Sequence, residues 1–517
     1  MKPRTLLRIA ILLAAVGYVG YGYLGKHDAG PHAHPAAPIA PHAKSFTLGT
    51  LEFSACELPQ SKSGATTSAY CAKFSQPENR AAPEARALDL RLALIKSDAV
   101  AADSDIVVYL AGGPGQSAID TWPRVAGAFE LLRRHHHILL LDQRGTGGSN
   151  ALLCPGKEGD EKSITTPVGE GFDPKQMRDL TQACLAAVQK KADPRYYTTS
   201  DAVADLEALR QALGAPLFDL VGISYGTRMA QQYAMRHADG VRSIVLDSVA
   251  PNELVLGEDF AINLEAALKA QFAGCTQAPD CNKAFGDPYA SLQKLRAALH
   301  AQPKEIELRD PVTFRSITRR VDDRVVAGLV RMFAYTPETA ALLPLSIAQG
   351  LKGDYTPLLG QTQVLAGDMS DLAENGMQMS VICSEDAELL TPRPQDADLV
   401  LGTAMIDGLR SACEVWPHGA RPDDFHTPLK SDKPVLVLEG EFDPVTPPRY
   451  GEQVMKTLSN AKLIVAKGQG HNVIGRGCIP KLVEDFVDKL SAQSLDTKCV
   501  DALGLTPAFV DFNGSSP

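Results

Sequence analysis

The residues of this chain best placed to do chemistry form the pentapeptide Gly-Ile-Ser-Tyr-Gly at 222–226, with Ser224 at its centre. A largely apolar run, 217–221, precedes it, and a helix-like run, 227–237, follows it. Small glycines on both sides of a serine, between a strand and a helix, are typical of a sharp turn that exposes the serine hydroxyl. The pattern is weak by itself in a chain of 517 residues with 42 glycines. Its meaning depends on whether the chain also supplies the partners that a nucleophilic serine needs.

Two such partners occur later in the chain. Asp443 stands in a polar turn after the strand-like run 434–440, and His471 stands in Gly-Gln-Gly-His after the short apolar run 463–466. A serine hydroxyl is a poor nucleophile until a histidine can take its proton, and the histidine needs an acid to fix its tautomer. Taken singly, Asp443 is also consistent with a turn residue and His471 with a loop residue. Because serine, acid and histidine each follow a predicted strand, in the order used by α/β-hydrolases, the set predicts a catalytic triad.

A glycine-rich turn predicts the fourth part of such a site, the oxyanion hole. The strand-like run 105–111 ends in Gly-Gly-Pro-Gly at 112–115. The backbone N–H groups of this turn, with Gly113 as the preferred donor, can point at a developing negative oxygen together with the N–H of Tyr225. A phosphate loop is the competing interpretation, but this turn contains neither G-x-G-x-x-G nor the lysine-bearing P-loop pattern.

These motifs resemble those of the prolyl and tripeptidyl aminopeptidases of the α/β-hydrolase class. The similar segments are Gly-Gly-Pro-Gly at 112–115, Asp-Gln-Arg-Gly-Thr-Gly-Gly-Ser at 142–149, Gly-Ile-Ser-Tyr-Gly-Thr at 222–227 and Ser-Ile-Val-Leu-Asp at 243–247. Asp-Pro-Val-Thr-Pro at 443–447 and the sequence around His471 resemble the C-terminal segment of the tripeptidyl branch. The resemblance runs from about 46 to about 490. It implies a serine aminopeptidase that forms an acyl-enzyme on Ser224.

Two departures from the prolyl branch bear on specificity. Prolyl aminopeptidases usually carry a histidine just before Gly-Gly-Pro-Gly, where this chain has Ala111. Their Asp-Gln-Arg-Gly motif usually continues Ser-Gly-Arg, where this chain reads Thr-Gly-Gly. Both differences favour the tripeptidyl-like branch over strict proline specificity.

The succession of strand-like and helix-like runs predicts an α/β-hydrolase fold, with a mostly parallel central sheet and helices on both faces. A helix is expected at 201–213, with Gly214 as its stop. The core is expected in two parts, 45–250 and 431–500, followed by a tail at 501–517. Strands are expected at about 46–54, 86–95, 105–111, 137–142, 217–223, 243–247, 434–440 and 461–466.

Between these two parts, residues 251–430 are rich in Ala, Leu and Gln and have helical periodicity. We interpret them as a mainly helical cap, inserted after the sixth predicted strand and folded over the site. An aminopeptidase must recognise a free ammonium group, which calls for a carboxylate in a partly dry site. Glu385 and Asp386 follow an apolar stretch and are the candidates; a solvated acidic turn is the alternative. Glu385 also stands two residues after a cysteine, which resembles the cap motif of the tripeptidyl branch.

Ten cysteines indicate an oxidising compartment, because none of them forms the C-x-x-C pattern of zinc or thioredoxin-like sites. Buried free thiols in a cytosolic enzyme are the alternative. The sequence does not fix connectivity. The simplest arrangement joins neighbours along the chain: Cys56 with Cys71, Cys154 with Cys184, Cys275 with Cys281, Cys383 with Cys413, and Cys478 with Cys499.

The N-terminus also indicates export. Basic residues precede an apolar run at 9–24, so 1–25 is predicted to be a signal peptide, with an uncleaved membrane anchor as the alternative. Residues 26–44 are rich in Pro, Ala and His and indicate a flexible linker. The protein is therefore expected in the periplasm or outside the cell, and in contact with a membrane only through such an anchor. A net charge of −10 argues against a nucleic acid partner and favours substrates with a positive amino end.

Several functions remain in competition at this point. The leading hypothesis is an exopeptidase acting on peptides with a free N-terminus. A carboxylesterase or lipase would use the same triad without an amine-binding acid. A non-catalytic binding protein would not need serine, acid, histidine and oxyanion turn together. Dehalogenase and epoxide hydrolase chemistry is disfavoured because those relatives place an aspartate where this chain has Ser224. No metal or organic cofactor is required. The number of residues released and the oligomeric state stay open.

Overall fold

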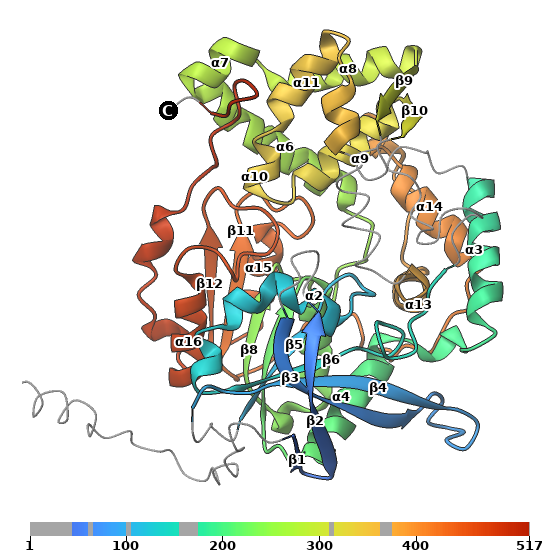
Figure 1. Cartoon of the computed structure of the whole chain (residues 1–517), viewed down its shortest axis with the longest axis vertical. Coiled ribbons are helices and arrows are strands. Elements are labelled where there is room, and N and C mark those ends of the chain that lie inside the picture. The colour runs from blue at the N-terminus through green and yellow to red at the C-terminus, as the bar shows by residue number, and fades with distance from the viewer. Residues whose placement is uncertain are drawn as a thin grey trace, which may run out of the picture.

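A ten-stranded sheet forms the lower half of the molecule in Figure 1. The computed structural model of the chain describes residues 44–59, 66–99, 105–154, 174–309, 315–361 and 375–515. The strand order is β1-β2-β3-β4-β6-β5-β7-β8-β11-β12. The first four strands are antiparallel neighbours, and the sheet becomes parallel from β6 onward. The predicted signal and linker lie outside the described residues except for Lys44.

The antiparallel edge is larger than the sequence predicts. The expected strand at 46–54 is two strands, β1 (Ser45–Leu48) and β2 (Leu51–Pro59), because Gly49 turns the chain with φ +60°. β3 (Thr66–Pro77) was not expected at all, because half of its residues are polar and only part of it is buried. β4 (Ala87–Ile95) lies where the sequence predicts a strand.

The parallel strands are those that place the candidate residues. β5 (Ile106–Leu110), β6 (His137–Leu141), β7 (Phe218–Ile223) and β11 (Val435–Gly440) are buried along their whole length. Burial on both faces explains their largely apolar sequences, since helices cover a parallel sheet from two sides. β8 (Val241–Asp247) and β12 (Ala461–Ala466) complete this part. All six strands were predicted from the sequence to within about two residues.

Helices cover both faces of the sheet and bury two separate apolar clusters. α4 (Thr199–Leu213), α5 (Tyr225–Arg236) and α15 (Pro448–Met455) contribute to one cluster. α2 (Ala118–Val125) and α16 (Ile479–Lys489) contribute to the other. α4 was predicted correctly: the Thr198 side chain accepts a hydrogen bond from Asp201 N at its start, and Gly214 ends it with φ 63°. The layers are those of the predicted α/β fold.

A mainly helical insertion lies between β8 and β11 and forms the upper half of Figure 1. It has an apolar cluster of its own, built largely by α6, α8, α9 and α11. The insertion follows the eighth strand of the chain, not the sixth as expected, because the N-terminal hairpin and β3 add two. Its helices are α6 (Phe260–Gln277), α7 (Pro279–Phe285), α8 (Pro288–Ala301), α9 (Asp323–Phe333), α10 (Pro337–Ala340), α11 (Leu343–Leu351), α13 (Asn375–Glu385) and α14 (Ala404–Cys413).

Two features near the insertion were not expected. β9 (Lys304–Arg309) and β10 (Ser316–Val321) form an antiparallel pair within it, and in β9 apolar residues alternate with charged ones. α3 (Pro174–Val188), from the first part of the core sequence, lies beside α14 (Figure 1).

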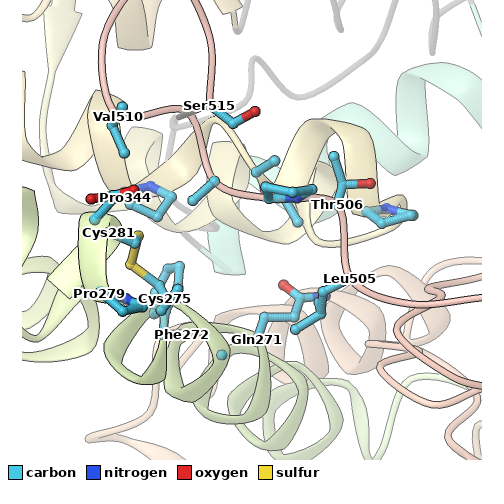
Figure 2. A pocket seen from close by; sticks show the side chains of 18 residues that line it. Gln271, Phe272, Cys275, Pro279, Cys281, Pro344, Leu505, Thr506, Val510 and Ser515 are labelled. Carbon is cyan, nitrogen blue, oxygen red and sulfur yellow. A yellow bond between two sulfur atoms is a disulfide. The ribbon is translucent and has the colours of Figure 1, made fainter. Parts of the chain in front are cut away.

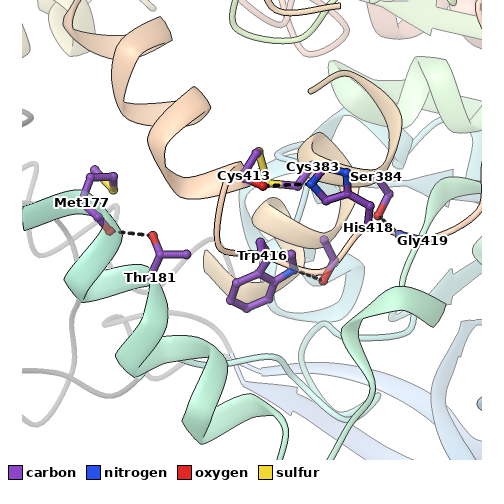
Figure 3. Close-up of a disulfide and its surroundings, with 9 residues drawn as sticks. Met177, Thr181, Cys383, Ser384, Cys413, Trp416, His418 and Gly419 are labelled. Atoms are coloured by element: carbon purple, nitrogen blue, oxygen red, sulfur yellow. Dashed lines mark hydrogen bonds between the residues drawn. A yellow bond between two sulfur atoms is a disulfide. The ribbon is translucent and has the colours of Figure 1, made fainter. Parts of the chain in front are cut away.

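Five disulfides join the ten cysteines, and they pair neighbours along the chain as the simplest arrangement predicts. Figure 3 shows Cys383–Cys413, which ties α13 to α14. Beside it the Trp416 indole donates a hydrogen bond to Ser380 Oγ at 3.1 Å. Such cross-links suit an extracellular or exported protein. Among the described residues, no helix has the length and apolar character needed to cross a membrane.

Candidate active site

The three residues of the predicted triad follow three parallel strands of one sheet. Ser224 comes directly after β7, Asp443 comes three residues after β11, and His471 comes five residues after β12. These strands lie in the order β7-β8-β11-β12. Since the carboxyl ends of parallel strands meet at one edge, the three turns share that edge of the sheet.

The side chains of these residues form a continuous hydrogen-bonded chain. His471 Nε2 lies 3.0 Å from Ser224 Oγ, and His471 Nδ1 lies 2.7 Å from Asp443 Oδ2. Because Asp443 can only accept when ionised, Nδ1 carries the hydrogen and Nε2 is left to take the serine proton. The arrangement is capable of nucleophilic catalysis by Ser224.

Asp443 is itself fixed by its own turn. Its Oδ1 accepts hydrogen bonds from the backbone N–H groups of Val445 and Thr446, both at 2.8 Å. The Thr446 hydroxyl donates to Oδ2 at 3.0 Å and also lies 3.3 Å from His471 Nδ1. These contacts hold the carboxylate in one orientation. They also satisfy its oxygens in a place where Asp443 is only 1% exposed to water.

The turn at Ser224 has the backbone that the flanking glycines allow. Ser224 has φ 55° and ψ −123°, a conformation that residues with side chains rarely adopt. A Cβ on Gly222 would lie 2.5 Å from the carbonyl oxygen of Gly226, and a Cβ on Gly226 would lie 2.0 Å from that of Leu110. Both positions therefore require glycine for the turn to close.

Electrostatics favour the protonated form of His471. Burial alone would lower its pKa, but the charge of Asp443, the hydrogen bond to Asp443 and the charge of Asp247 together raise it above the ordinary value. The Tyr335 ring stands edge-on to the imidazole at 5.3 Å, and the Tyr335 carbonyl accepts a hydrogen bond from His471 N at 2.7 Å. The insertion therefore touches the histidine directly through Tyr335, which lies in the short segment between α9 and α10.

The glycine-rich turn lies against the nucleophile, as an oxyanion hole requires. A Cβ on Gly112 would lie 3.2 Å from Ser224 Cβ. Gly113 follows with φ +108°, a backbone conformation open to glycine. Tyr225 is the first residue of α5, so its N–H is one of the donors that have no partner inside the helix.

The structure buries Glu385 at the end of α13 in contact with α4. Thr199 donates to it twice, from its N–H to Oε1 at 2.6 Å and from its hydroxyl to Oε2 at 2.9 Å. The Tyr225 hydroxyl lies 2.6 Å from Thr199 Oγ1, so the residue beside the nucleophile joins the same network. Burial raises the pKa of Glu385 to about 8; the positive charge of Arg228 and the hydrogen bonds from Thr199 oppose the shift, and Asp386 adds to it.

Asp386 has a different partner, which the sequence did not suggest. Arg228 of α5 binds it at 2.9 Å, and both side chains are fully buried. His426 Nε2 lies 3.6 Å from Asp386 Oδ1 and 2.9 Å from the Glu385 carbonyl oxygen. Asp386 is thus occupied by an internal ion pair, while Glu385 has neutral partners.

Sequence reasoning missed Thr446, Thr199 and Arg228. Asp-x-x-Thr in the turn after β11 is a local signal for Thr446, because such side chains often bond the backbone two or three residues away. Thr199 and Arg228 lie 186 and 158 residues from their acidic partners, so no local pattern identifies them.

A cavity of about 310 Å³ lies away from the triad, between residues 505–515 near the C-terminus and the insertion (Figure 2). The Cys275–Cys281 disulfide, Phe272 and Pro344 stand on one side of it and Leu505 on the other. No side chain of the triad lines this cavity. Among the described residues, no cluster of His, Cys, Asp or Glu is arranged to hold a metal ion.

Together, a mostly parallel sheet with covered faces and a Ser–His–Asp chain at the carboxyl edge of its parallel strands define a serine hydrolase of the α/β type. The family model for the α/β hydrolase fold matches residues 105–475, and the chain belongs to that family.

Relatives at low identity include several peptidases. The chain is similar to serine protease Hip1 of Mycobacterium tuberculosis, 24% identical over 96% of this chain and 98% of that protein. It is also similar to tripeptidyl aminopeptidase of Streptomyces coelicolor, 23% identical over 76% of each chain. Among solved structures, a proline iminopeptidase of Mycobacterium smegmatis has a TM-score of 0.40 at 15% identity, covering 81% of this chain and 98% of that one.

Proposed function

We propose that the protein is an exported serine aminopeptidase that cleaves short peptides or single residues from free N-termini. The observation that carries the proposal is the hydrogen-bonded chain from Ser224 through His471 to Asp443, with contacts of 3.0 and 2.7 Å. Relatives named as a serine protease and as a tripeptidyl aminopeptidase support the peptidase class. The five disulfides support export.

The reaction would proceed through an acyl-enzyme. Ser224 Oγ attacks the scissile carbonyl while His471 Nε2 takes its proton, and the N–H groups of Gly113 and Tyr225 stabilise the oxyanion. His471 then gives that proton to the leaving amine. Water then enters, loses a proton to His471 and attacks the acyl carbon, and His471 returns that proton to Ser224 Oγ as the acyl group leaves.

Glu385 is the proposed ligand of the substrate ammonium group. Each of its oxygens accepts one hydrogen bond from Thr199, so lone pairs remain for a further donor. An ammonium group beside it would favour the ionised carboxylate. Asp386 is the weaker candidate, because Arg228 already neutralises it.

A carboxylesterase is the second candidate, and one observation favours it. Glu385 is only 2% exposed, so a substrate amine reaches it only if Thr199 or the end of α13 shifts. An esterase would need no such movement.

Comparing a tripeptide chromogenic amide with its N-acetylated twin separates the two functions. The aminopeptidase proposal predicts a preference of at least about a hundredfold in kcat/KM for the free amine, since a lost charged hydrogen bond in a dry site costs that much. Ser224→Ala serves as the blank. Equal rates on both twins, or hydrolysis of p-nitrophenyl acetate alone, would move the assignment to an esterase.

A further inference from the structure

The residue at the end of β8 contacts both halves of the triad. The Asp247 main-chain carbonyl accepts a hydrogen bond from Ser224 N at 2.8 Å. Its carboxylate accepts two more from the turn after the histidine, from Val473 N to Oδ1 at 2.9 Å and from Ile474 N to Oδ2 at 3.0 Å. β8 lies between β7 and β11, which places Asp247 between the nucleophile and the acid of the triad.

The next residue along the chain adds a third bond to the same turn. Ser248 Oγ accepts from Asn472 N at 2.8 Å. Ser248 and Asn472 have φ values of 58° and 69°, a region that residues with side chains seldom occupy. Such conformations persist only where surrounding contacts hold them. Three consecutive backbone N–H groups after His471 are thus bound by two side chains that are 0% exposed.

Charge also connects Asp247 to the histidine. Burial raises the pKa of Asp247 to about 6, against the opposing effect of its two backbone bonds and of His471. The groups that face it are Tyr109 of β5, Glu439 of the adjacent strand β11, and Asp443 in the turn after β11. Burial and the charges of Asp443 and Asp247 raise the pKa of Glu439 well above the ordinary value, and its hydrogen bond from Val249 N opposes the shift. Asp443 and Asp247 are the two carboxyl groups whose charges raise the pKa of His471.

We propose that Asp247 is a positioning residue of the active site. Its carbonyl fixes the backbone of Ser224, its carboxylate fixes the turn after His471, and its charge stabilises the imidazolium that forms when His471 takes the serine proton. The proposal rests on the proposed serine hydrolase function, but it holds for peptide and ester substrates alike.

The test is the pH dependence of kcat/KM for Asp247→Asn, measured on the tripeptide amide and on p-nitrophenyl acetate. We expect kcat to fall about tenfold to a hundredfold with KM nearly unchanged, because displaced catalytic groups cost about this much. Loss of the negative charge lowers the pKa of His471, so the acidic limb should move to lower pH by about half a unit to one unit. A purely structural role would not move that limb.

Asp219→Asn is the matched control. Asp219 is also a fully buried carboxylate with a pKa raised by burial to about 6, but it lies near the start of β7, away from the triad. It should keep the wild-type acidic limb. Ser248→Ala removes one bond to the His471 turn without removing charge, so it should lower kcat several-fold and leave the limb in place.

Two results would overturn the proposal. The first is a folded Asp247→Asn with wild-type kcat and acidic limb on both substrates. The second applies if Asp247→Asn does not fold. In that case, a wild-type kcat in Ser248→Ala would show that the bonds to the turn after His471 do not position the histidine. Failure of the aminopeptidase proposal is distinguishable, because it appears in the wild-type enzyme as equal rates on the free and acetylated peptides and leaves the ester measurements intact.

Discussion

The acid of the triad and the acids of the insertion are all buried, but they are stabilised in different ways. Asp443 is held by N–H groups of its own turn, two and three residues away, and by His471. Glu385 and Asp386 depend on Thr199 and Arg228, which lie on other helices. A locally held acid keeps one oxygen directed at its catalytic partner. An acid held by distant elements is part of the contact between insertion and core, so its burial alone does not define a role in catalysis.

The largest effect is expected where the triad itself is broken, by removing the nucleophile that Asp443 and His471 serve. Ser224→Ala should fold normally and lose at least about a thousandfold in kcat, because the triad acts as a unit and only the oxyanion hole and substrate binding remain. Steady-state hydrolysis of the tripeptide amide measures the loss, and circular dichroism checks the fold. Retention of more than a tenth of the activity would place the nucleophile elsewhere.

For Asp386 we expect a loss of stability and not primarily a loss of catalysis, and Arg228→Met tests this. Removing one partner of a buried ion pair leaves an uncompensated charge, which should cost about 3–5 kcal/mol of unfolding free energy. Urea denaturation measures it. Arg236→Met is the control on the same helix, because the Arg236–Asp424 pair is partly exposed and its loss should cost under about 1 kcal/mol.

Asp386→Asn completes that comparison. If the internal pair with Arg228 is the role of Asp386, this variant loses stability while its KM for a free-amine substrate changes less than that of a Glu385 variant. A selective rise in KM with unchanged stability would instead make Asp386 the amine ligand.

The same division between local and distant partners explains what the sequence could predict. The six parallel strands, α4 and the order of Ser224, Asp443 and His471 all follow from local patterns, and the structure brings the three side chains into contact. β3 was missed because half of its residues are polar, as an antiparallel strand with one solvated face allows. The partners of Glu385 and Asp386 depend on how α13 packs on α4 and α5, which no pattern along one chain specifies.

Glu385→Gln tests the proposed amine site, and its expected effect on activity is smaller than that of Ser224→Ala. Gln cannot carry the charge that attracts an ammonium group, so KM for the free tripeptide amide should rise about tenfold or more. Hydrolysis of p-nitrophenyl acetate should not change. Glu388→Gln is the control three residues away, since that side chain is 76% exposed and should leave both substrates unaffected. Equal losses on amide and ester would refute amine recognition by Glu385.

The pH dependence of KM gives a smaller effect and depends on the same carboxyl group. Burial raises the pKa of Glu385 to about 8, so the free enzyme carries a proton there at neutral pH. Since only the ionised form attracts an ammonium group, KM for the free amine should fall several-fold between pH 6 and pH 8. Dividing the KM of the free amine by the KM of p-nitrophenyl acetate at each pH removes the contribution of His471, because His471 acts on both substrates. A KM ratio that is flat over this range would contradict binding at Glu385.

The raised pKa of Glu385 also predicts how stability changes with pH. The folded protein keeps a proton that the unfolded chain releases above its ordinary value of 4.5, so this group stabilises the fold less as pH rises toward about 8. Glu385→Gln stays neutral at every pH and removes that dependence. The melting temperature of the wild-type protein should therefore drop more between pH 5 and pH 8 than that of the variant. An identical drop in both proteins would show that Glu385 already ionises near its ordinary pKa, and that its burial against Thr199 costs little.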